Sequence, residues 1–130
     1  MKLTINFGIF LAAVLAIQAY GQHMNEQDSP CPNVVVTSEL TKCLSDARDR
    51  ADAKLNAVYK EIRGRFEGAD AENLTKTQRL WIQYRDANCS AERELYEGGT
   101  AKYPVYFACL ESLTRVRTRE LQVTYAVRLK

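Results

Sequence analysis

The chain has 130 residues, of which 46% are hydrophobic and 26% are charged, as expected for one globular domain. Its 18 lysines and arginines nearly balance its 16 aspartates and glutamates, for a formal net charge of +2. Nucleic-acid-binding proteins show a strong basic bias or a basic stripe, so this composition argues against that class and we expect no nucleic-acid partner.

Residues 1–21 have the pattern of a signal peptide. Lys2 gives a short positive start, an apolar run extends from Ile5 to Ile17, and a small-x-small cleavage site ends at Gly21. We expect cleavage after Gly21 and a periplasmic or secreted protein. The apolar run is shorter than the ~20 residues of a membrane span, so no stable span is expected. An uncleaved N-terminal anchor is the alternative.

Four cysteines follow the expected cleavage site: Cys31, Cys43, Cys89 and Cys109. An even number of cysteines in a small exported domain predicts two disulfides. We expect no metal site and no cofactor, because the spacings contain no CxxC pair and the only histidine is His23. Residues 22–37 are polar, with a proline on each side of Cys31, and predict an extended arm. His23 is expected in a mobile tail of that arm.

Residues 38–130 are expected to form one helical domain. The first helix is predicted from an N-cap at Ser38 to a stop at Gly68. Within it, apolar side chains recur at steps of three and four residues, which is the spacing of one helix face. These side chains are Leu40, Leu44, Ala47, Ala51, Leu55, Val58, Ile62 and Phe66.

The second helix is predicted from about Leu74 to Glu97, with a capping box of Thr75 and Gln78 at its start and two glycines after its end. Two neighbouring stripes are expected to pack on partner helices. One contains Gln78, Trp81, Ile82, Arg85 and Cys89. The other contains Leu80, Tyr84, Ala87, Ala91 and Leu95. The third helix is predicted to begin near Pro104 and to run into the 120s.

Three long helices with short loops predict an all-α, antiparallel three-helix bundle stapled by two disulfides. Antiparallel packing brings the start of the first helix, the end of the second and the start of the third to one pole. All four cysteines are therefore expected there. The preferred pairs are Cys31–Cys43 and Cys89–Cys109, and the other pairings remain geometrically possible.

Several polar residues fall on or beside the apolar faces, where a charge is costly unless it is paired. We predict a buried polar network of Asp52, Asn56, Tyr59, Gln78, Arg85, Asp86 and Arg117. Such a network either fixes the register of the helices or lines a partner-binding groove. No nucleophile–base pair is found, and arginines beside Asp52 and Asp86 would keep both carboxylates ionised. No catalytic residue and no enzymatic activity are therefore expected.

These residues also form a motif series. Its elements are Cys43, Asp52-x-x-Leu-Asn-x-x-Tyr59, Gln78-Arg-x-Trp-Ile-x-Tyr-Arg-Asp-x-x-Cys89, Gly98-Gly-Thr100 and Cys109-Leu-x-x-Leu-Thr-x-x-Arg117-x-x-x-Leu121. The series resembles the LprI-like lysozyme-inhibitor domain and extends from about Cys31 to Leu121. The resemblance implies a small helical, disulfide-bonded domain outside the bacterial cytoplasm that inhibits lysozyme.

The connection from Glu97 to Tyr103 is the candidate partner-binding segment, with Thr100, Lys102 and Tyr103 as its contact residues. A near-neutral chain gains little long-range attraction to a basic enzyme, so inhibition would depend on local shape. The expected partner is a protein, namely lysozyme or another cell-wall hydrolase. The alternative is a structural or interaction module of the cell envelope that has an endogenous partner and does not inhibit lysozyme.

Overall fold

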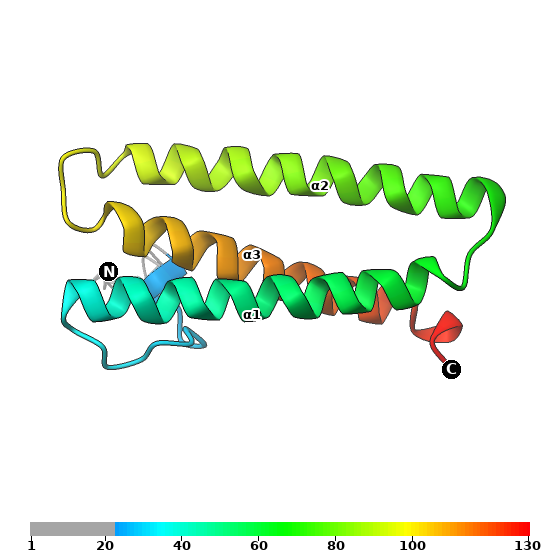
Figure 1. The fold of residues 1–130 in the computed structure, drawn as a ribbon, viewed down its shortest axis with the longest axis horizontal. Coiled ribbons are helices and arrows are strands. Elements are labelled where there is room, and N and C mark those ends of the chain that lie inside the picture. The colour runs from blue at the N-terminus through cyan, green and yellow to red at the C-terminus, as the bar shows by residue number, and fades with distance from the viewer. Residues whose placement is uncertain (1–22) are drawn as a thin grey trace, which may run out of the picture.

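The structure is a computed structural model in which residues 23–130 are described. This part of the chain is helical and contains no strand. Its elements in order are η1 (His23–Asn25), α1 (Thr37–Arg63), α2 (Gly68–Glu94), α3 (Lys102–Thr124) and η2 (Ala126–Arg128). The three long helices run antiparallel in succession, so the predicted three-helix bundle is confirmed (Figure 1). The expected signal peptide lies outside the described residues.

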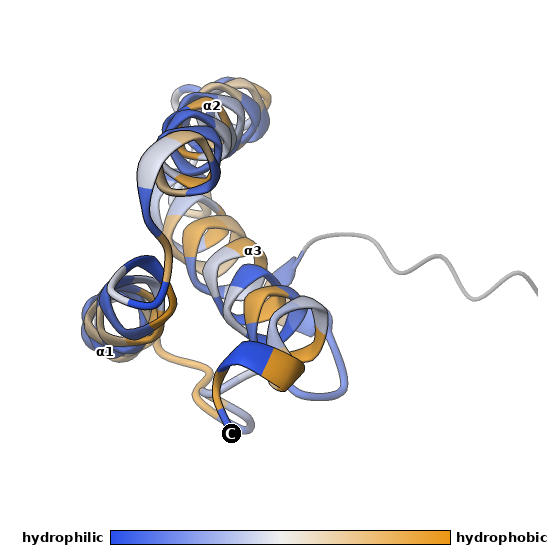
Figure 2. Ribbon diagram, turned by 90° about the vertical axis from the view of Figure 1, so that its right-hand side faces the viewer, coloured by the Kyte–Doolittle hydropathy of each residue, from blue (hydrophilic) through white to orange (hydrophobic). Residues whose placement is uncertain are grey.

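The central element is α3. It packs against both α1 and α2, whereas α1 and α2 scarcely touch each other. Figure 2, an end-on view, shows α1 and α2 standing apart, each beside α3. Ten residues of α3 are buried, and only four residues are buried in each of the other two helices. The third helix of the chain therefore supplies most of the shared core.

The connection between α1 and α2 is shorter and earlier than expected. α1 ends at Arg63, and α2 begins at Gly68 instead of Leu74. Gly68 has a φ of +53°, a left-handed conformation that suits glycine, and it turns the chain into α2 rather than ending α1. The predicted capping box is wrong for the same reason, because Thr75 lies inside α2.

The other helix ends differ less. α1 begins at Thr37 after Val36, so Ser38 is not its N-cap. α2 ends at Glu94, three residues before the predicted end. Pro104 lies in the first turn of α3, as predicted, where a missing N–H costs nothing.

The buried residues form three clusters along the bundle. The first contains Leu55, Ile62, Leu74 and Leu121, with Trp81 and Phe66 packed against it. The second contains Cys31, Leu44 and Ala108, and the third contains Cys89, Cys109 and Leu110. The two cysteine-containing clusters lie toward the α2–α3 loop, so the disulfides complete the core at that pole.

The second predicted stripe of α2 is not a packing face. Leu80 is 54% exposed, Tyr84 58% and Leu95 81%. Ile82 of the first stripe is also exposed, at 37%. The reason is that α2 contacts essentially one neighbour, α3, and a single neighbour covers only one narrow face of a helix.

No helix within residues 23–130 combines the length and apolar character needed to cross a bilayer.

Candidate functional site

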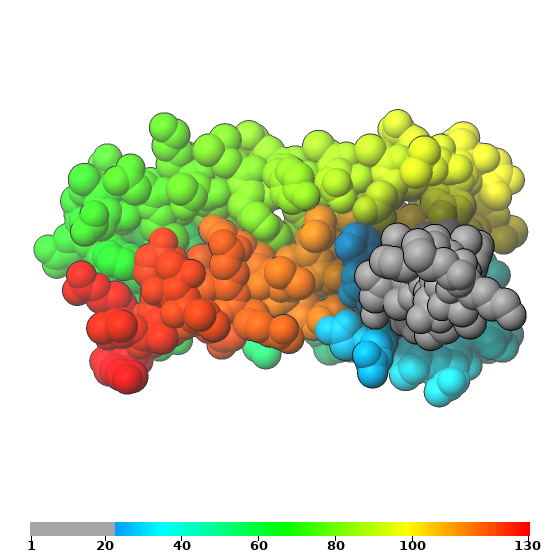
Figure 3. Space-filling view, turned by 180° about the vertical axis from the view of Figure 1, so that it is seen from behind, coloured from blue at the N-terminus to red at the C-terminus, as the bar shows by residue number. Residues whose placement is uncertain are grey.

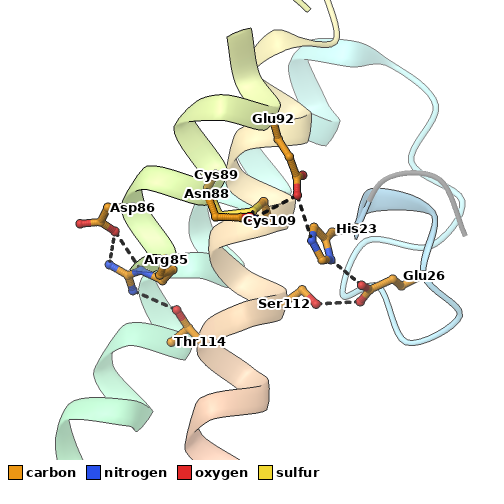
Figure 4. Close-up of a disulfide and its surroundings, with 10 residues drawn as sticks. All are labelled: His23, Glu26, Arg85, Asp86, Asn88, Cys89, Glu92, Cys109, Ser112 and Thr114. Atoms are coloured by element: carbon orange, nitrogen blue, oxygen red, sulfur yellow. Dashed lines mark hydrogen bonds and ion pairs between the residues drawn. A yellow bond between two sulfur atoms is a disulfide. The ribbon is translucent and has the colours of Figure 1, made fainter. Parts of the chain in front are cut away.

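Two disulfides define one pole of the molecule. Cys31 of the arm is bonded to Cys43 of α1, and Cys89 of α2 is bonded to Cys109 of α3. These are the pairs preferred from the sequence. Cys89 and Cys109 are fully buried, and the bond between them joins the two helices below their connecting loop (Figure 4). The two helices that flank that loop are therefore covalently joined close to it.

Arg85 links all three helices. Its Nη1 atom donates to Asp52 Oδ1 of α1 at 2.7 Å and to Thr114 Oγ1 of α3 at 2.9 Å. Its Nε atom donates to Asp86 Oδ1 of its own helix at 2.9 Å (Figure 4). The Arg85 side chain is only 13% exposed. A charge this well covered is stabilised by its two carboxylate partners.

A second polar pair lies on the other side of Trp81. Arg117 Nε of α3 donates to Gln78 Oε1 of α2 at 3.1 Å, and Arg117 Nη1 reaches Glu120 at 2.8 Å. The Trp81 ring lies 5.4 Å from the Arg85 guanidinium carbon and 5.8 Å from that of Arg117. Two arginines thus contact one indole, a favourable cation–π arrangement.

The predicted polar network does not form as one unit. Tyr59 forms no hydrogen bond with Arg85 or Arg117 and donates instead to Thr75 Oγ1 at 3.0 Å. Arg63 Nε, outside the predicted network, donates to the same oxygen at 3.0 Å. Asn56 is exposed on α1, so its predicted place in the network is wrong. Thr114, a fully buried hydroxyl, was missed by the sequence because it reads as a flank of the apolar stripe of α3.

The N-terminal arm is tied to the bundle, which corrects the expected mobile tail at His23. His23 Nδ1 lies 2.5 Å from Glu26 Oε1, and His23 Nε2 lies 3.3 Å from Glu92 Oε1 of α2. Ser112 Oγ of α3 donates to Glu26 Oε2 at 2.8 Å. Figure 3 shows the start of the described chain, in blue, lying beside the orange surface of α3.

Arg115 of α3 completes this attachment. It forms ion pairs with Asp28, with Glu26 at 3.3 Å and with Glu111 at 3.1 Å. Glu111 is only 5% exposed, and burial raises the pKa of its carboxyl although Arg115 acts in the opposite direction. The partners of Arg115 lie up to 89 positions away in the sequence, so no local pattern could have predicted this cluster.

His23, Glu92 and Cys109 bring one ligand-type atom each within 4.8 Å of one another. Cys109 Sγ is bonded to Cys89 and cannot provide the thiolate that a metal would need. The trio is therefore a packing arrangement around the disulfide, and we assign it no metal.

The α2–α3 loop presents a fixed polar pair beside exposed apolar side chains. Lys102 Nζ lies 2.6 Å from Glu97 Oε2, and its hydrogen bond lowers the pKa of that carboxyl. Lys102 also lies 5.9 Å from the centre of the Tyr103 ring. Tyr103 is 54% exposed, Leu95 is 81% exposed, and Thr100 is exposed between them. We call residues 95–103 the pole loop.

These features define a small helical domain, stabilised by two disulfides, with an exposed loop at one pole and two arginines packed around Trp81. The chain belongs to the lysozyme inhibitor LprI family, whose model matches residues 31–121. Both the family and the disulfides fit a location outside the cytoplasm.

A relative from Rhizobium meliloti (strain 1021), itself described as an uncharacterized protein, is 32% identical over 111 residues. The matched part covers 75% of this chain and 80% of the relative. No solved structure matches the chain. The family supports a protein-binding role of the lysozyme-inhibitor type, and the printed description of the relative adds no activity to it.

Proposed function

We propose that this protein inhibits a lysozyme outside the bacterial cytoplasm and that the pole loop contacts the enzyme. The observation that carries the proposal is the match of the lysozyme inhibitor LprI model to residues 31–121, which include all three long helices nearly to their ends and both disulfides. A family match supports fold more strongly than function, and the chemistry of the pole loop supplies the independent support for the contact.

The pole loop has the properties of an inhibitory contact. The Cys89–Cys109 disulfide holds the two helices that carry it, so little conformational entropy is lost when a partner binds. Tyr103 and Leu95 offer exposed apolar surface, and tyrosine is enriched among the residues that dominate binding energy.

Lys102 supplies the polar part of the contact. A glycosidase cleft contains a pair of carboxyl groups, and an ammonium group is attracted to them when at least one is ionised. Lys102 is held by Glu97, whose own side chain is 69% exposed. An enzyme carboxylate can therefore take the place of Glu97 as the partner of Lys102, while Glu97 turns to solvent.

Long-range attraction contributes little to this mode of binding. The chain has a net charge of +2 and does not complement a basic lysozyme. We therefore expect an association rate that changes little with salt, unlike that of an acidic inhibitor steered to its target.

The test is a lysozyme assay with the oxidised mature chain and two tyrosine variants. Tyr103→Ala removes the proposed anchor, and Tyr84→Ala removes a tyrosine of similar exposure, 58% against 54%, from the outer face of α2. We expect Tyr103→Ala to weaken inhibition by roughly tenfold or more and Tyr84→Ala to leave it unchanged. A Lys102→Ala variant separates the polar contribution from the apolar one.

Two results would contradict the proposal at different levels. Equal inhibition by the wild type and by a Tyr103→Ala/Lys102→Ala variant would move the contact surface away from the pole loop. Absence of inhibition by the wild type at micromolar concentration would favour the envelope interaction module with an endogenous partner. The exposed Leu80 and Tyr84 on α2 are the first surface to probe in that case.

A further inference from the structure

A groove of about 350 Å³ runs between α1 and α3, on residues that do not belong to the pole loop. Small side chains of both helices form its floor, among them Ala47, Ala51 and Thr118. Its lining carries Arg50 and Lys54 from α1, and Arg115 and Arg119 from α3. The carboxylate of Glu111 also lines it and is paired with Arg115. The two cation pairs are each spaced i, i+4, so four cations follow two neighbouring helix faces.

Arg115 is fully occupied, since it pairs with Glu26, Asp28 and Glu111. Among residues 23–130, by contrast, no carboxylate forms an ion pair with Arg50, Lys54 or Arg119. Lys54 and Arg119 have no acidic residue three or four positions away in either direction of the sequence. Asp46, one turn before Arg50, is bound by Lys42 at 2.7 Å.

These three cations line the same groove without a carboxylate partner in the described part of the chain. Half of the other lysines and arginines in residues 23–130 form ion pairs, so what sets these three apart is that they line one groove. Cations one turn apart on a helix repel each other and lower its stability. An anion in the groove would relieve that repulsion.

We propose that this groove binds a short linear anion that carries carboxylate or phosphate groups about one helical turn apart. Arg50 and Lys54 would contact one side of the anion, and Arg119 would contact the other. The volume lies at the lower end of the range for small-molecule sites, so the ligand is short. No aromatic side chain lines the groove, so it offers no stacking platform for a nucleobase.

The experiment is a calorimetric titration of the oxidised mature chain at low ionic strength with two probes, tripolyphosphate and tetra-glutamate. The groove variant is Arg50→Gln/Arg119→Gln. The matched control is Lys76→Gln/Arg79→Gln, which removes two exposed charges from α2. We expect the groove variant to bind at least roughly tenfold more weakly and the control to bind as the wild type does.

The two probes identify the anionic group. Binding of tripolyphosphate alone indicates a phosphate ligand, and binding of tetra-glutamate alone indicates a carboxylate ligand. Binding of both shows that the groove accepts both groups. Backbone amide shifts measured by NMR during the titration should be confined to the neighbourhood of Ala47, Ala51 and Thr118. This readout also holds if a variant folds poorly.

No binding of either probe to the wild type, equal weakening in both double variants, or shifts spread over the whole surface would overturn the proposal. Lysozyme inhibition should be unchanged in the groove variant. The anion site and the proposed lysozyme inhibition are therefore tested independently of each other.

Discussion

Arg85 Nη1 of α2 lies 2.7 Å from Asp52 Oδ1 of α1, and this ion pair joins the two long helices that have the least contact with each other. Thr114 of α3 donates weakly to the same carboxylate oxygen, at 3.4 Å. We call Arg85, Asp52, Asp86 and Thr114 the polar centre. It connects α1 and α2, the two long helices with the least contact between them. Loss of this cluster should lower the free energy of unfolding while the helices keep their arrangement.

Replacement of Arg85 by lysine tests this cluster. Lysine keeps the charge but loses the planar fork that reaches Asp52, Asp86 and Thr114 together, so we expect the free energy of unfolding to fall by about 1–2 kcal/mol. Urea denaturation monitored by circular dichroism measures the change. Arg79→Lys, an exposed position on the same helix, should change stability by less than ~0.5 kcal/mol. Equal effects at the two positions would show that the cluster contributes nothing specific.

The two disulfides should contribute differently. Cys89–Cys109 closes a separation of 20 residues between two core helices, and a Cys89→Ala/Cys109→Ala variant should lose about 3 kcal/mol of global stability. Cys31–Cys43 secures the arm, so its removal should mainly speed amide hydrogen exchange before α1. Denaturation and hydrogen exchange on both variants separate these outcomes. A larger global loss from the Cys31–Cys43 pair would contradict this division.

Glu111 predicts a pH dependence. Its carboxyl is buried beside Arg115, and burial raises its pKa above the ordinary value of 4.5. The folded state therefore holds this proton more tightly than the unfolded state, and its stabilising effect is present below pH 4.5 and lost as the pH rises through the raised value. At pH 7 a Glu111→Gln variant should match or exceed the wild type in stability. The advantage should shrink as the pH falls toward 4.5. Denaturation at several pH values measures it, and a variant less stable than the wild type at pH 7 would show that the Arg115 ion pair outweighs burial.

His23 is expected to hold the arm against α2. A His23→Ala variant loses both the contact with Glu26 and the contact with Glu92, so the arm should exchange its amide hydrogens faster and be cut more readily by protease. Global stability should change by less than about 1 kcal/mol, because the Cys31–Cys43 disulfide remains. Gln27→Ala, at an exposed position of the same arm, is the control. Unchanged exchange in His23→Ala would show that the disulfide alone fixes the arm.

The sequence was sufficient for the number, type and order of the helices because the apolar spacing in α1 is regular. The sequence was not sufficient where the same residue type or spacing is compatible with two different structures. A glycine after an apolar stripe predicts the end of a helix, but Gly68, with its positive φ, lies at the turn into the next one. Leu80 and Tyr84 follow helical spacing, but spacing alone does not reveal that α2 has only one close neighbour.

The polar centre was partly predictable. Arg85 and Asp52 were placed together because a charge on an apolar face requires a partner, and the structure pairs them. The prediction for Asn56 is wrong because a polar residue beside an apolar stripe can face either the core or solvent, and Asn56 is exposed. The contacts of His23 with Glu92 depend on how the arm folds back over the bundle, and no periodic pattern encodes that path.

The placement of the two disulfides also makes the molecule divisible. One bond lies within the arm and α1, the other joins α2 to α3, and neither crosses the connection at residues 64–67. A single cut after the exposed Arg65 would leave two pieces, each with its own disulfide and with no covalent bond between them. The pieces would be held together by non-covalent contacts alone: the buried contacts of α3 with α1, the Arg85–Asp52 pair, and the polar contacts of the arm with α2 and α3. The domain is therefore a natural starting point for a split protein whose halves reassemble without reshuffling their cysteines.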